Sequence, residues 1–155
     1  MPSASPMTTL CEEQQTMQQL RALLEQEQHY LMKAEIEHLE EVAAQKSALV
    51  TRMTQLAGQR HGALAAAGFA ARDEGMEGWL AGGAEADAAG LWSEILAMTR
   101  EAKEFNRLNG MLINKHMAYT QGALNSLRPP QQSGHIYGPS GQTTSGGSNR
   151  RYVIG

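Results

Sequence analysis

Two pairs of acidic and histidine residues stand at helical spacings that could hold a metal ion. Glu35 and His38 form one Glu-x-x-His step, the spacing used in di-iron helical bundles, and Glu25 and His29 stand four residues apart. A di-iron site needs a second such step and two further inward carboxylates, and the chain has no second copy. A solvated charged face and a weak surface pair explain these residues better, so no metal or other cofactor is predicted.

No other residues combine into a catalytic arrangement. Cys11 stands at a helix start without a nearby histidine that could activate its thiol. Residues 138–147 (GPSGQTTSGG) resemble a phosphate loop but lack its lysine and follow no strand. His116 falls in a helical seam, where a packed interface residue is the better interpretation. The sequence therefore predicts a protein that is not an enzyme and that acts by binding.

Composition favours an all-α protein of the cytoplasm. Aromatic residues make up only 5%, too few to fill the pleats of a sheet, whereas Ala, Gln, Glu, Met and Leu favour helices. The 13 basic and 16 acidic residues give a net charge of −3, and the basic ones are scattered, which argues against nucleic acid. No apolar run approaches the roughly 18 residues of a membrane span. The N-terminus has no secretory signal pattern, and a single cysteine fits a reducing compartment.

Residues 9–67 are expected to form one long helix, after a flexible N-terminus at 1–8. Its start is open between a capping box of Thr9 and Glu12 and an upstream start capped by Ser5. At about 1.5 Å per residue, such a helix is too long for a compact globule. It must therefore lie along another helix.

An apolar stripe supports this long helix. Apolar residues recur every three or four positions, and the eleven-residue step from Leu31 to Val42 indicates a coiled-coil stutter within one helix. Gly68 is expected to end the helix in the left-handed conformation. Residues 68–88 form a connector with one short helix around Met76, which turns the chain back.

The second long helix is expected over 88–128, which completes an elongated antiparallel hairpin over 9–128. Asp87 is its expected cap, and Pro129 forces its end. A heptad pattern defines the seam by which it packs. The two seam positions read Leu91, Met98, Phe105, Leu112, Tyr119 and Ile95, Ala102, Asn109, His116, Ala123.

Beside the seam lies a second apolar stripe, which a pair of helices does not need. Something else should cover it, and methionines there suit varied apolar partners. Asn109 in the seam is either a tolerated core amide or an element that selects an incoming helix, with Asn106 on the same face. The stripe comprises Leu108, Met111, Ile113, Met117, Leu124 and Leu127. Residues 129–155 bury too little to fold alone and are expected to be a disordered tail.

Three segments late in the chain carry a resemblance to a known family. They are NRLNGMLI at 106–113, TQGALNSL at 120–127 followed by two prolines, and IYGPSGQTTSGGSNRR at 136–151. Their order and spacing are similar to those of the FlgN family of flagellar type III export chaperones. Upstream of residue 106, the chain agrees with that family only in helix length and pattern.

The resemblance implies a chaperone that binds hook-associated proteins of the hook–filament junction and delivers them to the export gate. Residues that match the family's substrate-binding stretch are Asn106, Asn109 and Met117, with Leu112 and Leu124 alongside. Tyr137 matches the tail tyrosine by which the family docks to the export-gate protein. The alternative is a homomeric coiled-coil structural or adaptor protein, such as a homodimer whose second stripe packs on itself.

Overall fold

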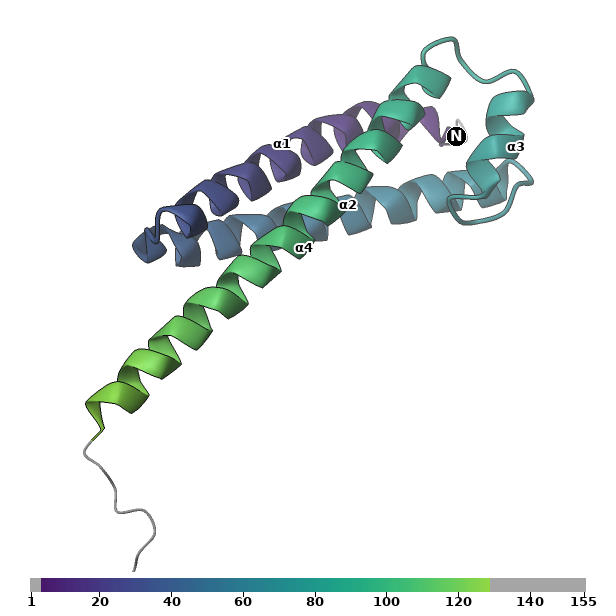
Figure 1. Cartoon of the computed structure of the whole chain (residues 1–155). Helices are drawn as coiled ribbons and strands as arrows, with labels where there is room; N and C mark the ends of the chain where they lie inside the picture. Colours follow the sequence, from purple (N-terminus) through teal and green to yellow (C-terminus); the bar gives the residue numbers. More distant parts are fainter. Residues whose placement is uncertain (1–3, 129–155) are drawn as a thin grey trace, which may run out of the picture. The chain divides into compact units, whose positions relative to one another are not determined.

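The computed structural model describes residues 4–128 of the 155-residue chain, and every regular element in that part is helical. The expected all-α class is therefore confirmed. The tail expected at 129–155 lies outside the described residues. The chain divides into two units, Met1–Lys115 and His116–Gly155, and the last helix runs through the division. The elements are α1 (Met7–Met32), a 3₁₀ turn η1 (Ile36–His38), α2 (Leu39–Ala66), α3 (Gly75–Ala81) and α4 (Ala88–Leu127) (Figure 1).

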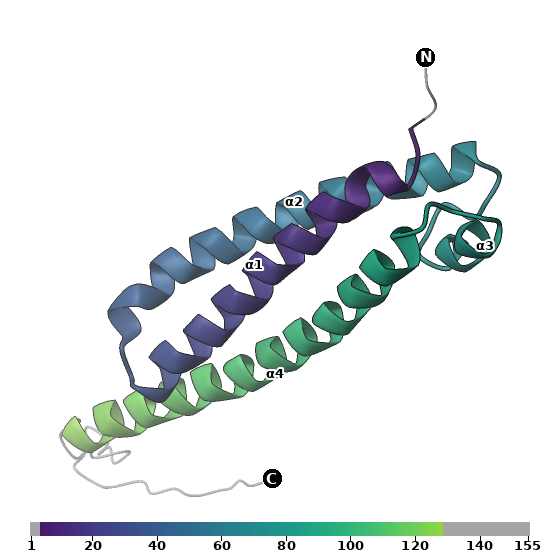
Figure 2. The same cartoon turned by 90° about the horizontal axis from the view of Figure 1, so that it is seen from above.

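The expected single helix over 9–67 is wrong. The chain turns back after Met32, and α1 and α2 run side by side as an antiparallel hairpin (Figures 1 and 2). A salt bridge of 3.0 Å between Lys46 and Glu27 joins the two helices near this turn. Folding back buries the apolar stripes of both halves against each other, and such tertiary packing stabilises helices more than a continuous helical pattern does.

Of the two expected starts of α1, the structure has the upstream one. The backbone N–H of Met7 donates to the Ser5 hydroxyl oxygen at 3.1 Å. Thr9 lies inside the helix and donates its hydroxyl to Glu13 at 2.8 Å, so it caps nothing. The capping box with Glu12 is therefore wrong.

Ala34 makes the turn between α1 and α2. Its φ of 57° is left-handed, its N–H donates to the Leu31 carbonyl at 3.2 Å, and the next N–H, of Glu35, donates to the Tyr30 carbonyl at 2.9 Å. These two bonds form a Schellman motif, in which glycine normally occupies the left-handed position. Residues 32–38 contain neither glycine nor proline, so no residue type marked this turn in the sequence.

Ala34→Gly is expected to raise the free energy of unfolding by about 1 kcal/mol, because glycine adopts a left-handed conformation without the steric cost of a β-carbon. Urea denaturation followed by circular dichroism measures this. Ala44→Gly, at an exposed position inside α2, is the control and should lower the same free energy by about 1 kcal/mol. A loss of stability in both variants would contradict the assigned turn.

The far end of the hairpin is closed by α3. Gly68 ends α2 with a φ of 91°, as expected, and the Phe69 N–H donates to the Leu64 carbonyl at 2.9 Å. The short helix α3 falls where the connector helix was expected, and its Trp79 and Leu80 pack against a core cluster at this end. The buried members of that cluster are Leu10, Leu64, Met76, Ala88, Trp92 and Ile95.

Within the first unit, α4 lies along α1 and runs parallel to it. Gln14 donates to Glu94 at 2.6 Å, and Arg21 pairs with Glu101 at 2.7 Å, so both contacts have the same sequence offset of 80 residues. The two contacts are one heptad apart, as expected for helices in coiled-coil register. An antiparallel pairing with the first helix was expected, and the hairpin explains the difference, because α4 enters from the α3 end.

The predicted seam of α4 is confirmed in the first unit, whereas its later members Tyr119 and Ala123, in the second unit, are exposed. Ile95, Ala102 and Asn109 are buried, and Phe105 is half-buried. A second core cluster forms along the middle of the seam. It consists of Met17, Leu20, Leu24 and Ala102, with Leu49, Met53, Met98 and Phe105 packed on it.

A buried ion pair joins α1 and α2 at the end of the hairpin where α3 lies. The Arg60 Nε donates to both carboxylate oxygens of Glu13 at 3.0 and 3.1 Å, and its Nη1 donates to Asp73 at 3.0 Å. The guanidinium carbon lies 4.4 Å from the ring centroid of Trp92, a cation–π contact. Burial raises the pKa of Asp73, but hydrogen bonds with His61 and Arg60 outweigh it and hold that pKa below its ordinary 3.8.

Candidate functional site

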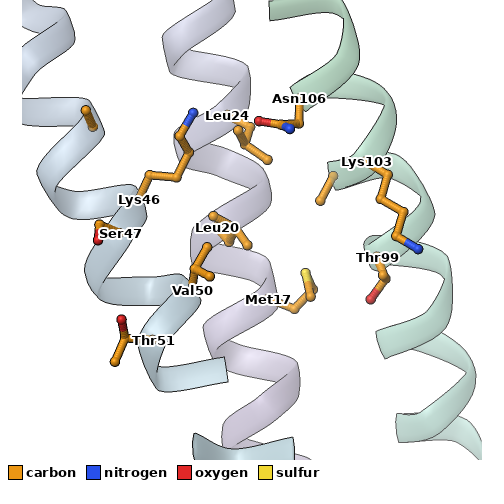
Figure 3. Close-up of a pocket in the computed structure, with 12 residues that line it drawn as sticks. Met17, Leu20, Leu24, Lys46, Ser47, Val50, Thr51, Thr99, Lys103 and Asn106 are labelled. Atoms are coloured by element: carbon orange, nitrogen blue, oxygen red, sulfur yellow. The ribbon is translucent and has the colours of Figure 1, made fainter. Parts of the chain in front are cut away.

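A groove runs along the first unit between α2 and α4, with α1 as its floor (Figure 3). Its volume is about 470 Å³. Figure 3 shows the side chains of α1 in the middle, those of α2 on one side and those of α4 on the other. The lining residues are Met17, Leu20 and Leu24 of α1; Ala43, Lys46, Ser47, Val50 and Thr51 of α2; and Thr99, Ala102, Lys103 and Asn106 of α4.

The floor of the groove is apolar, and its walls are mixed. Met17, Leu20 and Leu24 form the floor, and Val50 on the α2 wall is 48% exposed, which is high for a branched apolar side chain. The rest of the walls carry hydroxyl, ammonium and amide groups. An apolar strip between polar rims is the surface that the apolar face of an amphipathic helix fits.

A polar cluster of half-buried Lys46 with buried Glu27 and Asn109 joins the three helices near Leu24. The Lys46 ammonium lies 3.1 and 3.0 Å from the two carboxylate oxygens of Glu27, which is 4% exposed. The Asn109 amide donates to Glu27 and to the Leu24 carbonyl, each at 2.8 Å. The buried carboxylate thus has both a cation and a hydrogen-bond donor, which is the condition for burying a charge without a large penalty.

The structure separates the five predicted substrate-binding residues. Asn106 is exposed and lines the groove, whereas Asn109, only 1% exposed, already uses its amide on α1. Leu112 is half-buried. In the second unit, Met117 and Leu124 are exposed, at 65% and 53%. An incoming chain can reach Asn106, Met117 and Leu124 directly, but it cannot reach Asn109 while α4 lies on α1.

The predicted gate-docking residue Tyr137 and the phosphate-loop-like segment 138–147 lie outside the described residues. Within residues 4–128, no three His, Cys, Asp or Glu side chains gather as metal ligands would. The His38 ring instead stacks on Tyr30, with 4.7 Å between the ring centroids. None of the helices described in that range has the length and apolarity to cross a bilayer.

The α2 wall of the groove was not predicted from the sequence, because a single helix over 9–67 cannot supply both the floor and a wall of a groove. The available signal was the eleven-residue step between Leu31 and Val42. Met32 and Ile36 fall inside that step, outside the apolar stripe, and the structure leaves them 71% and 63% exposed. A turn would have explained this interruption as well as a stutter does.

Comparisons with known proteins agree with this architecture. The profile of the family described as FlgN protein matches residues 1–145. Among solved structures, the chain is similar to a crystal structure from Pseudomonas aeruginosa that is described as a flagella synthesis protein FlgN, with a TM-score of 0.61 and 26% sequence identity. That match covers 83% of this chain and 100% of the other. No curated protein sequence matches the chain.

Proposed function

The chain belongs to the FlgN family, and from this premise we propose that it is a cytoplasmic flagellar export chaperone. Its substrates are hook-associated proteins of the hook–filament junction. It binds their C-terminal helical segments, prevents their premature association and delivers them to the export gate. The mechanism consists of binding alone, with no bond made or broken. The family and the flagellar description of the similar structure support this assignment.

The observation that carries the proposal is the groove between α2 and α4. Its floor of Met17, Leu20 and Leu24 is apolar but only 2–8% exposed, and Val50 on the α2 wall, 48% exposed, adds apolar surface that a partner can contact. Each substrate side chain that becomes fully buried here gains roughly 1.5–3 kcal/mol before the cost of association. A gain of this size favours reversible binding, which a chaperone needs if it is to release its substrate.

Residues of α4 supply the remaining contacts in this proposal. Asn106 on the groove wall orients the incoming helix through its amide, and Leu112 adds a half-buried apolar edge. Met117 and Leu124 in the second unit present exposed apolar side chains to the substrate. The flexible thioether of Met117 can adapt to more than one apolar partner.

Val50→Gln tests the groove. Placing an amide where the substrate buries an apolar side chain is expected to weaken binding about tenfold, which corresponds to 1.4 kcal/mol. Calorimetric titration of the full chain with the C-terminal segments of hook-associated proteins measures this, and the heat-capacity change of binding should be negative. Met117→Ala in the same titration tests the exposed residues of the second unit.

Met32→Gln is the matched control, because Met32 is exposed like Val50 but lies outside the groove. It should leave the affinity unchanged. Equal losses for Met32→Gln and Val50→Gln, or none for either, would remove the groove from the proposal.

Tyr137 docks to the export-gate protein in this proposal, which rests on the resemblance of its tail segment to that of the family. Tyr137→Ala is expected to reduce binding to the gate protein severalfold and to leave substrate affinity unchanged. Loss of substrate binding in the same variant would place Tyr137 in the substrate site instead.

A homomeric coiled coil is the second candidate, favoured by the exposure of Met111 (57%) and Leu127 (80%). Self-association would bury these side chains in place of a substrate. Light scattering on the titrated samples separates the two functions. A monomer that forms a one-to-one complex supports the chaperone, and a stable dimer that ignores the segments supports the coiled coil.

A further inference from the structure

The charge of the groove is opposite to that of the chain. The chain has a net charge of −3, yet among residues 4–128 the charged residues that line the groove are Lys46 on the α2 wall and Lys103 on the α4 wall. In that range no carboxylate stands among the lining residues. The groove therefore has one lysine on each side of an apolar floor.

The two lysines differ in how their charge is balanced. Lys46 is paired with the buried carboxylate of Glu27 at 3.0 Å. Lys103 is exposed, and within residues 4–128 no carboxylate pairs with it. The acidic residues nearest in sequence are already engaged, Glu101 with Arg21 at 2.7 Å and Glu104 with Arg107 at 2.7 Å. The groove thus has one uncompensated positive charge, on its α4 side.

The C-terminal part of the chain has no acidic side chain that could pair with Lys103. After Glu104, the sequence contains no aspartate or glutamate, while it contains Lys115, Arg128 and Arg150. A C-terminal segment folded back into the groove, or the same segment of a second copy, would bring further positive charge towards Lys103. Charge complementarity at Lys103 therefore favours an acidic segment, and the C-terminal part of this chain, or of a second copy, is not one.

We infer that Lys103 selects, among amphipathic helices, those with a carboxylate beside their apolar face, an inference that rests on the proposed function of the groove. The groove spans Thr99 to Asn106 on one wall and Ala43 to Thr51 on the other, which is about two turns of helix, or roughly 10–12 Å. A helix of that length places its apolar side chains on the floor. One aspartate or glutamate at the edge of the apolar face then pairs with Lys103.

Three designed peptides of about three helical turns test this inference. They share one apolar face, and their flanking positions carry Glu, Gln or Lys. The full chain is expected to bind the Glu peptide about threefold more tightly than the Gln peptide, the size typical of one exposed ion pair, and the Lys peptide most weakly. In Lys103→Glu, the order of the three affinities should reverse, and both preferences should shrink at high salt.

Lys115→Glu is the matched control, since Lys115 is an exposed lysine of the same helix that does not line the groove. It changes the net charge equally and should keep the natural order of affinities. The same order in Lys103→Glu, equal binding of all three peptides, or no binding at all would overturn the inference. A dimer in light scattering that the peptides do not disturb would also overturn it, because a second copy would then fill the groove.

The natural C-terminal segments of hook-associated proteins, titrated alongside, separate this inference from the proposed function. If they bind the natural chain and Lys103→Glu equally well, the chaperone function holds and the selective role of Lys103 is wrong. If they do not bind while the Glu peptide binds through Lys103, the groove selects acidic helices of another protein, and the proposed substrates are wrong.

Discussion

Arg60→Leu is expected to lower the free energy of unfolding by about 3–5 kcal/mol, the cost of leaving the other member of a buried ion pair without its partner. Arg60 is 3% exposed, and the Glu13 carboxylate that accepts from it is fully buried. The substitution also removes the cation from the face of Trp92 and one donor from Asp73. Three helices and the segment before α3 would lose their shared contact at once.

Arg52→Leu supplies the comparison. Arg52 pairs with Glu12, so this second ion pair joins the same two helices, but both of its members are exposed. Such surface pairs contribute less than about 1 kcal/mol. Urea denaturation of both variants should therefore give a large loss for Arg60→Leu and a small one for Arg52→Leu. If Arg60→Leu lowered the free energy of unfolding as little as Arg52→Leu does, Glu13 would have another partner or water when Arg60 is absent.

Asn109→Ala is expected to lower the free energy of unfolding by about 2–3 kcal/mol. The variant loses two hydrogen bonds of 2.8 Å, one to the buried carboxylate of Glu27 and one to the Leu24 carbonyl. Hydrogen bonds to charged groups are the stronger ones, and the carboxylate would keep only Lys46 as a partner.

Asn106→Ala is the control, because Asn106 is the same residue type three positions earlier but is exposed on the groove wall. It should change stability by less than about 0.5 kcal/mol while weakening substrate binding. Urea denaturation and calorimetric titration of both variants separate the two roles. A stable Asn109→Ala variant that cannot bind substrate would contradict the structural role assigned to Asn109.

The sequence predicted the helices better than it predicted their arrangement. The seam through Ile95, Ala102 and Asn109 was correct because a heptad pattern reports which face of a helix is buried, whatever partner covers it. The turn at Ala34 was missed because an alanine occupies the left-handed position, where glycine normally stands and marks the end of a helix in the sequence. A periodic pattern can continue across such a turn, so it does not distinguish one long helix from two antiparallel ones.

The same error limited the prediction of the site. On the α4 wall only Asn106 was identified as a site residue, since none of the surplus apolar residues of α4 lines the groove. The α2 wall could not be identified, because the groove forms only when α2 folds back along α1, and this turn was not expected. The two asparagines also looked equivalent in the sequence. Only the contacts of Asn109 with α1 show that it belongs to the core.

The open side of the groove has a consequence for the lifetime of the protein. A substrate helix in the groove would take the place of a fourth helix beside α1, α2 and α4 of the first unit. If the proposed substrate helix fills the groove, it binds only the folded chain, and occupancy at a hundred times its dissociation constant adds about 2.7 kcal/mol to stability. The empty chaperone would then unfold and be degraded sooner than the loaded one. Its abundance in the cell would follow the supply of proteins waiting for export.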